Sequence, residues 1–144
     1  MAEYIPPAFD WVREQIELYE SSGGTEGTTL LDTGLPCIIV THTGNKTGAI
    51  RKIALMRVKD GDNYVLIGSM GGAPQNPVWV YNLRANADVE IRDTTEVTSM
   101  RVREVPEGEE RSRLWARGVE AFPTYAEYQT KTDRLIPVFL AEPV

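Results

Sequence analysis

The chain has 144 residues, of which 42% are hydrophobic and 25% are charged, and its formal net charge is -6 at pH 7. This length and balance predict one globular domain over residues 1–144 and exclude a disordered or fibrous chain. The acidic balance also argues against nucleic acid as a partner, because duplex binding depends on a broad face of Lys and Arg.

Cysteine usage and hydropathy bear on where the protein works. One cysteine, Cys37, cannot form a disulfide within the chain, and the first thirty residues lack the segments of a secretory signal. We therefore expect a cytoplasmic protein. The longest apolar runs, at residues 37–40 and 64–68, are far shorter than the ~20 residues of a membrane-spanning helix. Peripheral contact with the inner face of a membrane stays open.

The first predicted element is an amphipathic helix over residues 7–21, with two glycines just after its end. Its apolar face is formed by Phe9, Val12, Ile16 and Tyr19. The next stretch, residues 21–33, is rich in Gly, Ser and Thr and has no hydrophobic periodicity, which is typical of a loop.

From residue 35 the pattern becomes that of β-strands, predicted at residues 37–41, 50–58 and 64–69. The Asp60-Gly61 step predicts a tight turn, because Gly accepts positive φ. Asp60 and Asp62 also resemble the start of a calcium loop, but the later ligands are absent, which favours a plain turn. Short turns between the strands predict an antiparallel meander.

Helices and strands then alternate irregularly. Asn76 can cap a helix that begins at Pro77 and extends over residues 77–85. Two further strands are predicted at residues 89–92 and 97–105.

The last third of the chain predicts two helices and a strand. Pro106 and the acids after it open a helix whose positive dipole end favours those acids. Its apolar side is formed by Leu114, Trp115, Val119 and Phe122. Thr124 and Glu127 form a capping-box pattern for a short helix, and residues 136–141 predict a final strand. About six strands decorated by helices predict a mainly β fold with helices (α+β), in the form of a small antiparallel barrel.

A basic stretch without acids is the clearest functional signal. Between Thr33 and Lys59 there is no Asp or Glu, while the basic residues are Lys46, Arg51, Lys52, Arg57 and Lys59. In an acidic chain this favours a local site for one anionic ligand over a polyanion surface. Lys46 and Arg51 flank a glycine-bounded turn whose backbone N–H groups can form a concave anion site. A solvated hairpin tip is the alternative interpretation.

A second glycine-rich segment follows the strand at residues 64–69. Gly71 and Gly72 would let a flat or charged ligand approach the backbone closely. The helix start near Asn76 would add a positive dipole end.

Several other kinds of chemistry have little support. His42 is the only histidine and Cys37 the only cysteine, so neither a metal cluster nor a Cys-His nucleophile pair is expected. Cys37 lies in a β-branched run and is interpreted as a core residue. The turn around Lys46 lacks the glycine spacing of a phosphate loop, which disfavours a nucleotide triphosphatase.

Three groups of residues together resemble the deazaflavin (F420)-dependent nitroreductase and F420H2-dependent quinone reductase family of actinobacteria. They are Thr43 to Gly48 with Arg51; Gly71 and Gly72 with the run from Asn76 to Asn86; and the run from Phe122 to Pro137. The resemblance extends from about residue 30 to the C-terminus, and the N-terminal helix matches only in character. It implies a split β-barrel of the FMN-binding type that binds coenzyme F420. The reduced form, F420H2, would transfer a hydride to a quinone, an enone or a nitro compound.

The resemblance also implies roles for individual residues. It places Asn45, Lys46, Thr47 and Arg51 at the phosphate and acidic tail of the coenzyme. It places along the chromophore Lys52, Ile53, Ala54, Leu55, Met56, Ile67, Gly68, Ser69 and Met70, with contacts from Val78, Trp79, Val80, Tyr81 and Asn82. The expected catalytic groups are Tyr125 and Tyr128 at the open substrate face, together with Ser69, because their hydroxyls can donate to a reduced oxygen. Trp79 and one of the two tyrosines are also open to interpretation as core residues.

Departures from the family pattern narrow the substrate. Met56 and Phe122 stand where relatives can carry Tyr, and Met70 stands where relatives often carry Lys, so a quinone or an enone is a safer expectation than a nitroimidazole. A protein that binds or carries F420 without catalysis stays open, as does an FMN-dependent oxidoreductase on a related barrel. A homodimer also stays open, because split barrels can bury a sheet edge against a second copy.

Overall fold

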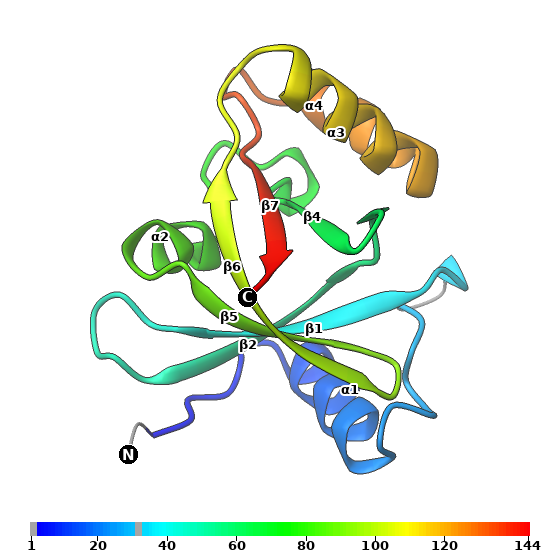
Figure 1. The fold of residues 1–144 in the computed structure, drawn as a ribbon, viewed down its shortest axis with the longest axis vertical. Coiled ribbons are helices and arrows are strands. Elements are labelled where there is room, and N and C mark those ends of the chain that lie inside the picture. The colour runs from blue at the N-terminus through cyan, green and yellow to red at the C-terminus, as the bar shows by residue number, and fades with distance from the viewer. Residues whose placement is uncertain (1–2, 31–32) are drawn as a thin grey trace.

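Over residues 3–30 and 33–144, which the computed structural model describes, seven antiparallel strands form one curled sheet with helices around it (Figure 1). The strands are β1 (Cys37–Thr43), β2 (Ile50–Met56), β3 (Lys59–Asp60), β4 (Asn63–Ile67), β5 (Asp88–Asp93), β6 (Glu96–Glu104) and β7 (Val138–Pro143). The helices are α1 (Asp10–Ser21), the 3-10 turn η2 (Met70–Gly72), α2 (Val78–Ala85), α3 (Glu109–Ala121) and α4 (Thr124–Thr130). The mainly β fold with helices is confirmed.

The connection between β2 and β3 forces the sheet to curl into a half-barrel. These two strands lie at opposite edges of the sheet, in the order β2-β1-β5-β6-β7-β4-β3. Only Arg57 and Val58 separate them in the chain, and such a link spans at most about 11 Å. The sheet must therefore curl until this link reaches from one edge to the other, and the amide of Val65 donates to the carbonyl of Val58 at 2.9 Å on the far edge. The strand predicted at residues 50–58 ends at Met56 because the chain passes from one edge to the other.

The strand order shows that the predicted meander is wrong. Short turns do join β1 to β2, β3 to β4 and β5 to β6, but β1 also pairs with β5 and β4 pairs with β7. Turn residues specify hairpins, whereas the neighbour of each hairpin depends on burial of apolar faces. In the β1–β5 and β4–β7 ladders, for example, Val40 lies opposite Ile91 and Leu66 lies opposite Phe139, all of them buried.

Three apolar clusters hold the helices to the barrel. The interior contains residues such as Ile38, Leu66 and Phe139, and α2 covers it through Trp79 and Val80. A second cluster lies beneath α3 and α4, and a third lies between α1 and the outer face of β1 and β2. The helices therefore cover the barrel from three sides, and α2 lies beside the β1–β2 hairpin (Figure 1).

The helix α1 begins three residues later than predicted. Val12, Ile16 and Tyr19 are buried as expected, but Phe9 precedes the helix in an extended conformation and is 67% exposed. The amide of Ile5 donates to the carbonyl of Ile50 at 2.9 Å, so the preceding chain follows the sheet instead of extending the helix. The placement of Phe9 on the apolar face is therefore wrong.

Two predicted helix caps are also wrong. The N-cap of α2 is Pro77 instead of Asn76, whose side-chain oxygen accepts a hydrogen bond from Arg134 at 2.8 Å. Thr124 is already the first residue of α4 and makes no capping bond. Tertiary contacts and a proline therefore set both helix starts, although sequence pattern favours side-chain caps.

The remaining boundaries differ by a few residues. The third helix begins at Glu109, after Gly108, instead of at Pro106. The last strand extends over Val138–Pro143, because it pairs with β6 as far as Pro143. The tight turn after Asp60 is confirmed, with Gly61 at φ 64° between paired residues.

Candidate functional site

The glycine-bounded turn joins β1 to β2 and is fastened to α2. Within the turn, the amide of Gly44 donates to the carbonyl of Ala49 at 2.7 Å, and Gly48 takes a left-handed φ of 73°. The amide of Asn45 donates to the side-chain oxygen of buried Asn82 at 2.9 Å. Two residues expected at the coenzyme, 37 positions apart, are thus in direct contact.

The basic residues of the acid-free stretch divide into paired and unpaired groups. Lys52 contacts Glu20 of α1 at 2.6 Å, and Arg57 contacts Asp93 at 3.1 Å. Lys46 and Arg51 form no ion pair with any carboxylate in the described part of the chain. Lys46 is exposed and Arg51 is half-buried, with its stem beside the turn at Gly44. Both charges are therefore available to an external anion.

The end of β4 is packed tightly against α2. A Cβ on Gly68 would lie 2.8 Å from a methyl of Val80, so only glycine fits where the strand passes the helix. Ser69 is buried, and Met70 follows with a φ of 47° and 55% exposure. A left-handed non-glycine residue costs of order 1–3 kcal/mol and persists where the surroundings impose it, often at functional sites.

Arg134 holds this segment from the other side. Its guanidinium donates to the carbonyls of Gly68 at 3.1 Å, Ser69 at 2.7 Å and Ala73 at 2.8 Å. It also donates to the side chain of Asn76. Arg134 belongs to the motif that carries the family resemblance, but the sequence assigned it no role, because nothing in its spacing shows which carbonyls it reaches.

The tyrosines of α4 form an aromatic cluster beside the same segment. Tyr125 packs edge-on against Phe122 with ring centres 5.0 Å apart, and Tyr128 lies 6.3 Å from Tyr125. Burial raises the pKa of Tyr125, which is only 5% exposed. A Cβ on Gly72 would lie 2.6 Å from the carbonyl of Tyr128, so the turn at η2 touches α4 directly. Neither tyrosine hydroxyl bonds to another residue that the structure describes.

The remaining candidate residues point in different directions. Along β2, Arg51, Ile53 and Leu55 lie opposite interior residues of β1, whereas Lys52 and Ala54 face α1. Met56 joins the cluster beneath α3 and α4 with Ile67 and Tyr125.

On α2, Val78 and Tyr81 are exposed, while Trp79 is buried with its ring centre 5.9 Å from that of Phe139. Some of the candidate residues are therefore exposed on the surface, and others pack in the core.

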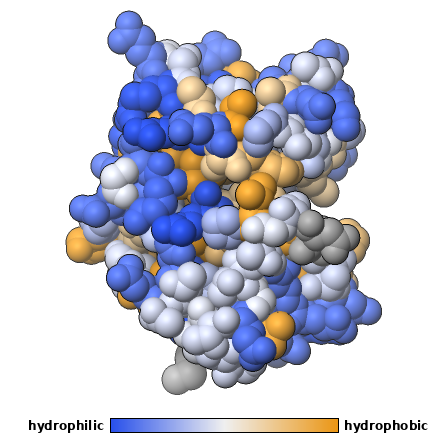
Figure 2. All heavy atoms as spheres, turned by 90° about the vertical axis from the view of Figure 1, so that its right-hand side faces the viewer, coloured by the Kyte–Doolittle hydropathy of each residue, from blue (hydrophilic) through white to orange (hydrophobic). Residues whose placement is uncertain are grey.

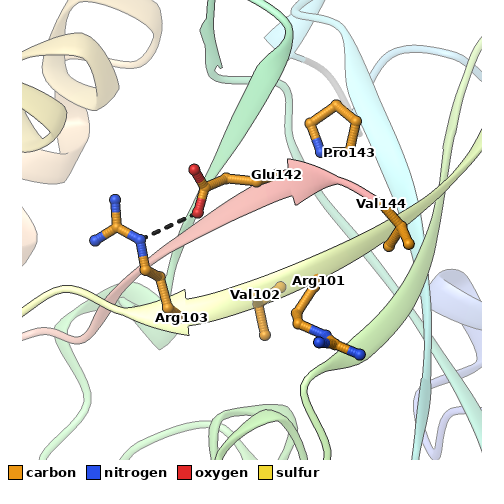
Figure 3. Close-up of a pocket in the computed structure, with 6 residues that line it drawn as sticks. All are labelled: Arg101, Val102, Arg103, Glu142, Pro143 and Val144. Carbon is orange, nitrogen blue, oxygen red and sulfur yellow. Dashed lines mark hydrogen bonds and ion pairs between the residues drawn. The ribbon is translucent and has the colours of Figure 1, made fainter.

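One surface hollow, of about 420 Å³, borders the hairpin that carries the turn through Thr41, His42, Thr43 and Ile50. Another, of about 340 Å³, lies away from the turn and is lined by Arg101, Val102, Arg103, Glu142, Pro143 and Val144 on β6 and β7 (Figure 3). Arg103 pairs there with Glu142 at 3.1 Å, and Arg101 pairs with Asp88. Its charges are already neutralised, so it offers an anionic ligand less than the turn with Lys46 and Arg51.

An apolar band gives a different kind of surface. Figure 2 shows it crossing the middle of one face, with polar residues above and below. The cluster beneath α3 and α4 includes partly buried apolar side chains, among them Leu35, Trp115 and Phe122. Such side chains carry no charge and could contact an apolar ligand.

Other chemistry finds no support in the described residues. Cys37 is buried, and burial raises the pKa of its thiol to about 11, which confirms its interpretation as a core residue. In the ranges 3–30 and 33–144 no group of three or more His, Cys, Asp or Glu could hold a metal ion. Asp60 instead pairs with Arg113 at 2.7 Å. No helix in these ranges is long and apolar enough to cross a membrane.

Comparison with known proteins decides the family. Residues 11–143 match the family described as F420H(2)-dependent quinone reductase. The chain belongs to this family. It is therefore an oxidoreductase whose coenzyme is F420, which overturns the FMN alternative.

Similar proteins agree with this placement. An F420H(2)-dependent quinone reductase of Mycobacterium tuberculosis is 36% identical over 124 residues, which cover 84% of this chain and 82% of that protein. A solved F420-H2 dependent reductase is 47% identical with a TM-score of 0.70, over 79% of this chain and 98% of that one. A solved chain described as a domain-swapped dimer is 48% identical with a TM-score of 0.73, over 92% of this chain and 98% of that one. The split-barrel fold is confirmed.

Proposed function

We propose that this protein transfers a hydride from reduced F420 to a small electrophilic acceptor, a quinone or an enone in preference to a nitro compound. The proposal rests on Lys46 and Arg51, two basic side chains that form no ion pair within the described residues. They lie at the turn that Asn82 fastens to α2. A coenzyme with a phosphate and an acidic tail fits this charge pattern. The segment after β4 packs on α2 where Gly68 meets Val80, and Met70 follows with a left-handed φ, which supports a site for the coenzyme ring beside this segment.

Different residues of the site would bind the acidic tail and the ring of the coenzyme. Reduced F420 supplies the hydride, so the protein needs no nucleophile or acid-base pair of its own. Lys46 and Arg51, with the amides around Asn45 and Thr47, would hold the tail. The backbone from Ile67 to Met70 and the facing residues of β2 and α2 would hold the ring and exclude water.

The acceptor side would be formed by α4. A hydroxyl from Tyr128, or from Ser69, would donate to the acceptor oxygen as negative charge grows on it. Tyr125 would mainly support Tyr128, because it is nearly buried among aromatic rings. The partly buried apolar side chains nearby suit a quinone or enone better than a charged acceptor.

Binding and turnover together test this function. The purified protein is titrated with oxidised F420 and with FMN, and oxidation of F420H2 is then followed with menadione, cyclohexenone and a nitroimidazole. We expect F420 binding, weak or absent FMN binding, and turnover on the first two acceptors. Stoichiometric F420 binding without turnover would indicate a carrier, and absence of F420 binding would contradict the proposal.

The assembly and location of the protein remain proposals of their own. The similar chain described as a domain-swapped dimer supports a homodimer. We also expect a cytoplasmic protein, and any membrane contact should be peripheral, at the inner face of the membrane. Mass measurement in solution and vesicle sedimentation would test these expectations.

Replacing Tyr128 with Phe should slow turnover more than it weakens coenzyme binding. A hydroxyl that faces the acceptor matters most as charge develops in the transition state, so kcat should fall about tenfold to a hundredfold. The dissociation constant for F420 should stay within about twofold. The matched control is Tyr4→Phe, since Tyr4 is exposed on the N-terminal segment. Wild-type turnover on quinones and enones alike would show that Tyr128 is only a hydrophobic wall.

A further inference from the structure

We propose that Arg134 is a positioning residue of the coenzyme site, holding the backbone from Gly68 to Asn76 in the conformation that F420 requires. The inference rests on the proposed function and assigns a role to a residue that would touch neither coenzyme nor acceptor. Four hydrogen bonds carry it, three to the carbonyls of Gly68, Ser69 and Ala73 and one to the side chain of Asn76, at 2.7 to 3.1 Å.

The acceptors of Arg134 are all uncharged. No carboxylate of the described residues forms an ion pair with its guanidinium, so its donors are spent on backbone and amide oxygens. Burial lowers the pKa of Arg134, but a guanidinium remains charged in proteins. Its planar fork offers five donors on three nitrogens in a fixed geometry, whereas the ammonium of a lysine offers three donors on one nitrogen and cannot reproduce this spread.

The segment that Arg134 holds needs an external tie. Three consecutive residues, Met70, Gly71 and Gly72, take positive φ angles of 47°, 65° and 79°. This backbone is costly for Met70 and flexible for the two glycines. Without a fixed frame the segment would populate other conformations, and the ring site beside it would lose its shape.

The other end of Arg134 is fixed to α4. Gln129 donates to the carbonyl of Arg134 at 2.8 Å and accepts from the amide of Ile136 at 3.1 Å. Gln129 follows Tyr128 directly in the helix. Arg134 therefore connects the end of β4, expected at the coenzyme, to the helix that carries the expected acceptor-side hydroxyl. Its loss should loosen both sides of the site together.

The test compares Arg134→Lys and Asn76→Ala with Arg113→Lys. Arg113 is a matched control, because it is an exposed arginine of α3 that pairs with Asp60. The readouts are the dissociation constant for oxidised F420, kcat and KM with menadione, and the melting temperature. We expect Arg134→Lys to raise the dissociation constant at least tenfold and to lower kcat, Asn76→Ala to raise it twofold to fivefold, and Arg113→Lys to match the wild type.

A rescue experiment separates positioning from general stability. In folded Arg134→Ala, guanidinium ions at tens of millimolar should partly restore F420 affinity, whereas sodium chloride at equal ionic strength should not. If Arg134→Ala does not fold, the other two variants decide. Wild-type F420 affinity in the folded fraction of Arg134→Lys and Asn76→Ala would overturn the inference while the proposed function stands. Absence of F420 binding by the wild type would instead overturn both.

Discussion

Replacing Lys46 and Arg51 together with Ala should weaken F420 binding by about a hundredfold or more. A hydrogen bond to a charged group contributes about 1.5–3 kcal/mol, so each single replacement should cost about tenfold or more in affinity. Lys46 lies within the turn, Arg51 lies on β2, and the two side chains share no partner in the described structure, so their effects should be close to additive. Arg51→Ala should cost more than Lys46→Ala if its fork binds a phosphate or carboxylate with two donors.

The measurement is a fluorescence titration with oxidised F420 at two salt concentrations. Salt should weaken the wild type more than the double variant, because a partly exposed ion pair is screened. Lys59→Ala is the matched control, since Lys59 belongs to the same acid-free stretch but lies on β3 at the opposite sheet edge. Melting temperatures without ligand should barely change. A double variant that melts much lower, or that binds F420 as tightly as the wild type, would show the two residues to be scaffold.

Local patterns were enough to predict most elements of the fold but not their neighbours. The hairpin at Gly61 could be predicted because its turn chemistry is contained in a few residues. The pairing of β1 with β5 depends on Val40 and Ile91, which are 51 positions apart, and no turn residue encodes it. The passage of the chain from β2 to β3 through Arg57 and Val58 looks in the sequence like one long strand, because the residues on both sides have the same β pattern.

The candidate site shows a similar limit. The sequence indicates that Lys46, Arg51 and Lys52 are all basic and close in the chain, but only tertiary structure separates Lys52, which Glu20 neutralises, from the other two. Asn76 fits a helix cap by sequence, yet its side chain is taken by Arg134. In both positions a contact across more than thirty residues outweighs a local preference, and such contacts have no signature in one sequence.

His42 should make the protein less stable as the pH falls from 7 to 4. Burial is the main cause that lowers the pKa of His42 to about 4, and Arg51, opposite it in the β1–β2 ladder, lowers it further. In the unfolded chain the pKa is about 6.5. Between pH 6.5 and 4 His42 is protonated in the unfolded chain but mostly neutral in the folded protein. The free energy of unfolding therefore keeps its full value above pH 6.5 and decreases as the pH falls toward 4. The loss should reach about 2 kcal/mol at pH 5 and about 3 kcal/mol at pH 4.

Urea unfolding of the wild type and of His42→Gln at pH 7, 5 and 4 isolates this effect. Other groups also titrate: hydrogen bonds from arginines lower the pKa of Asp60 and of Glu110, so their stabilisation is lost in acid too. Asp88 and Glu90 of β5 line the same hollow as His42. All of these carboxylates remain in the variant, so only the difference between the two pH dependences reports on His42. The free energy of unfolding of His42→Gln should therefore fall by about 2 kcal/mol less between pH 7 and 5. Parallel curves for the two proteins would mean that His42 takes up its proton in the folded state as readily as in the unfolded chain, and that its burial beside Arg51 carries no electrostatic cost.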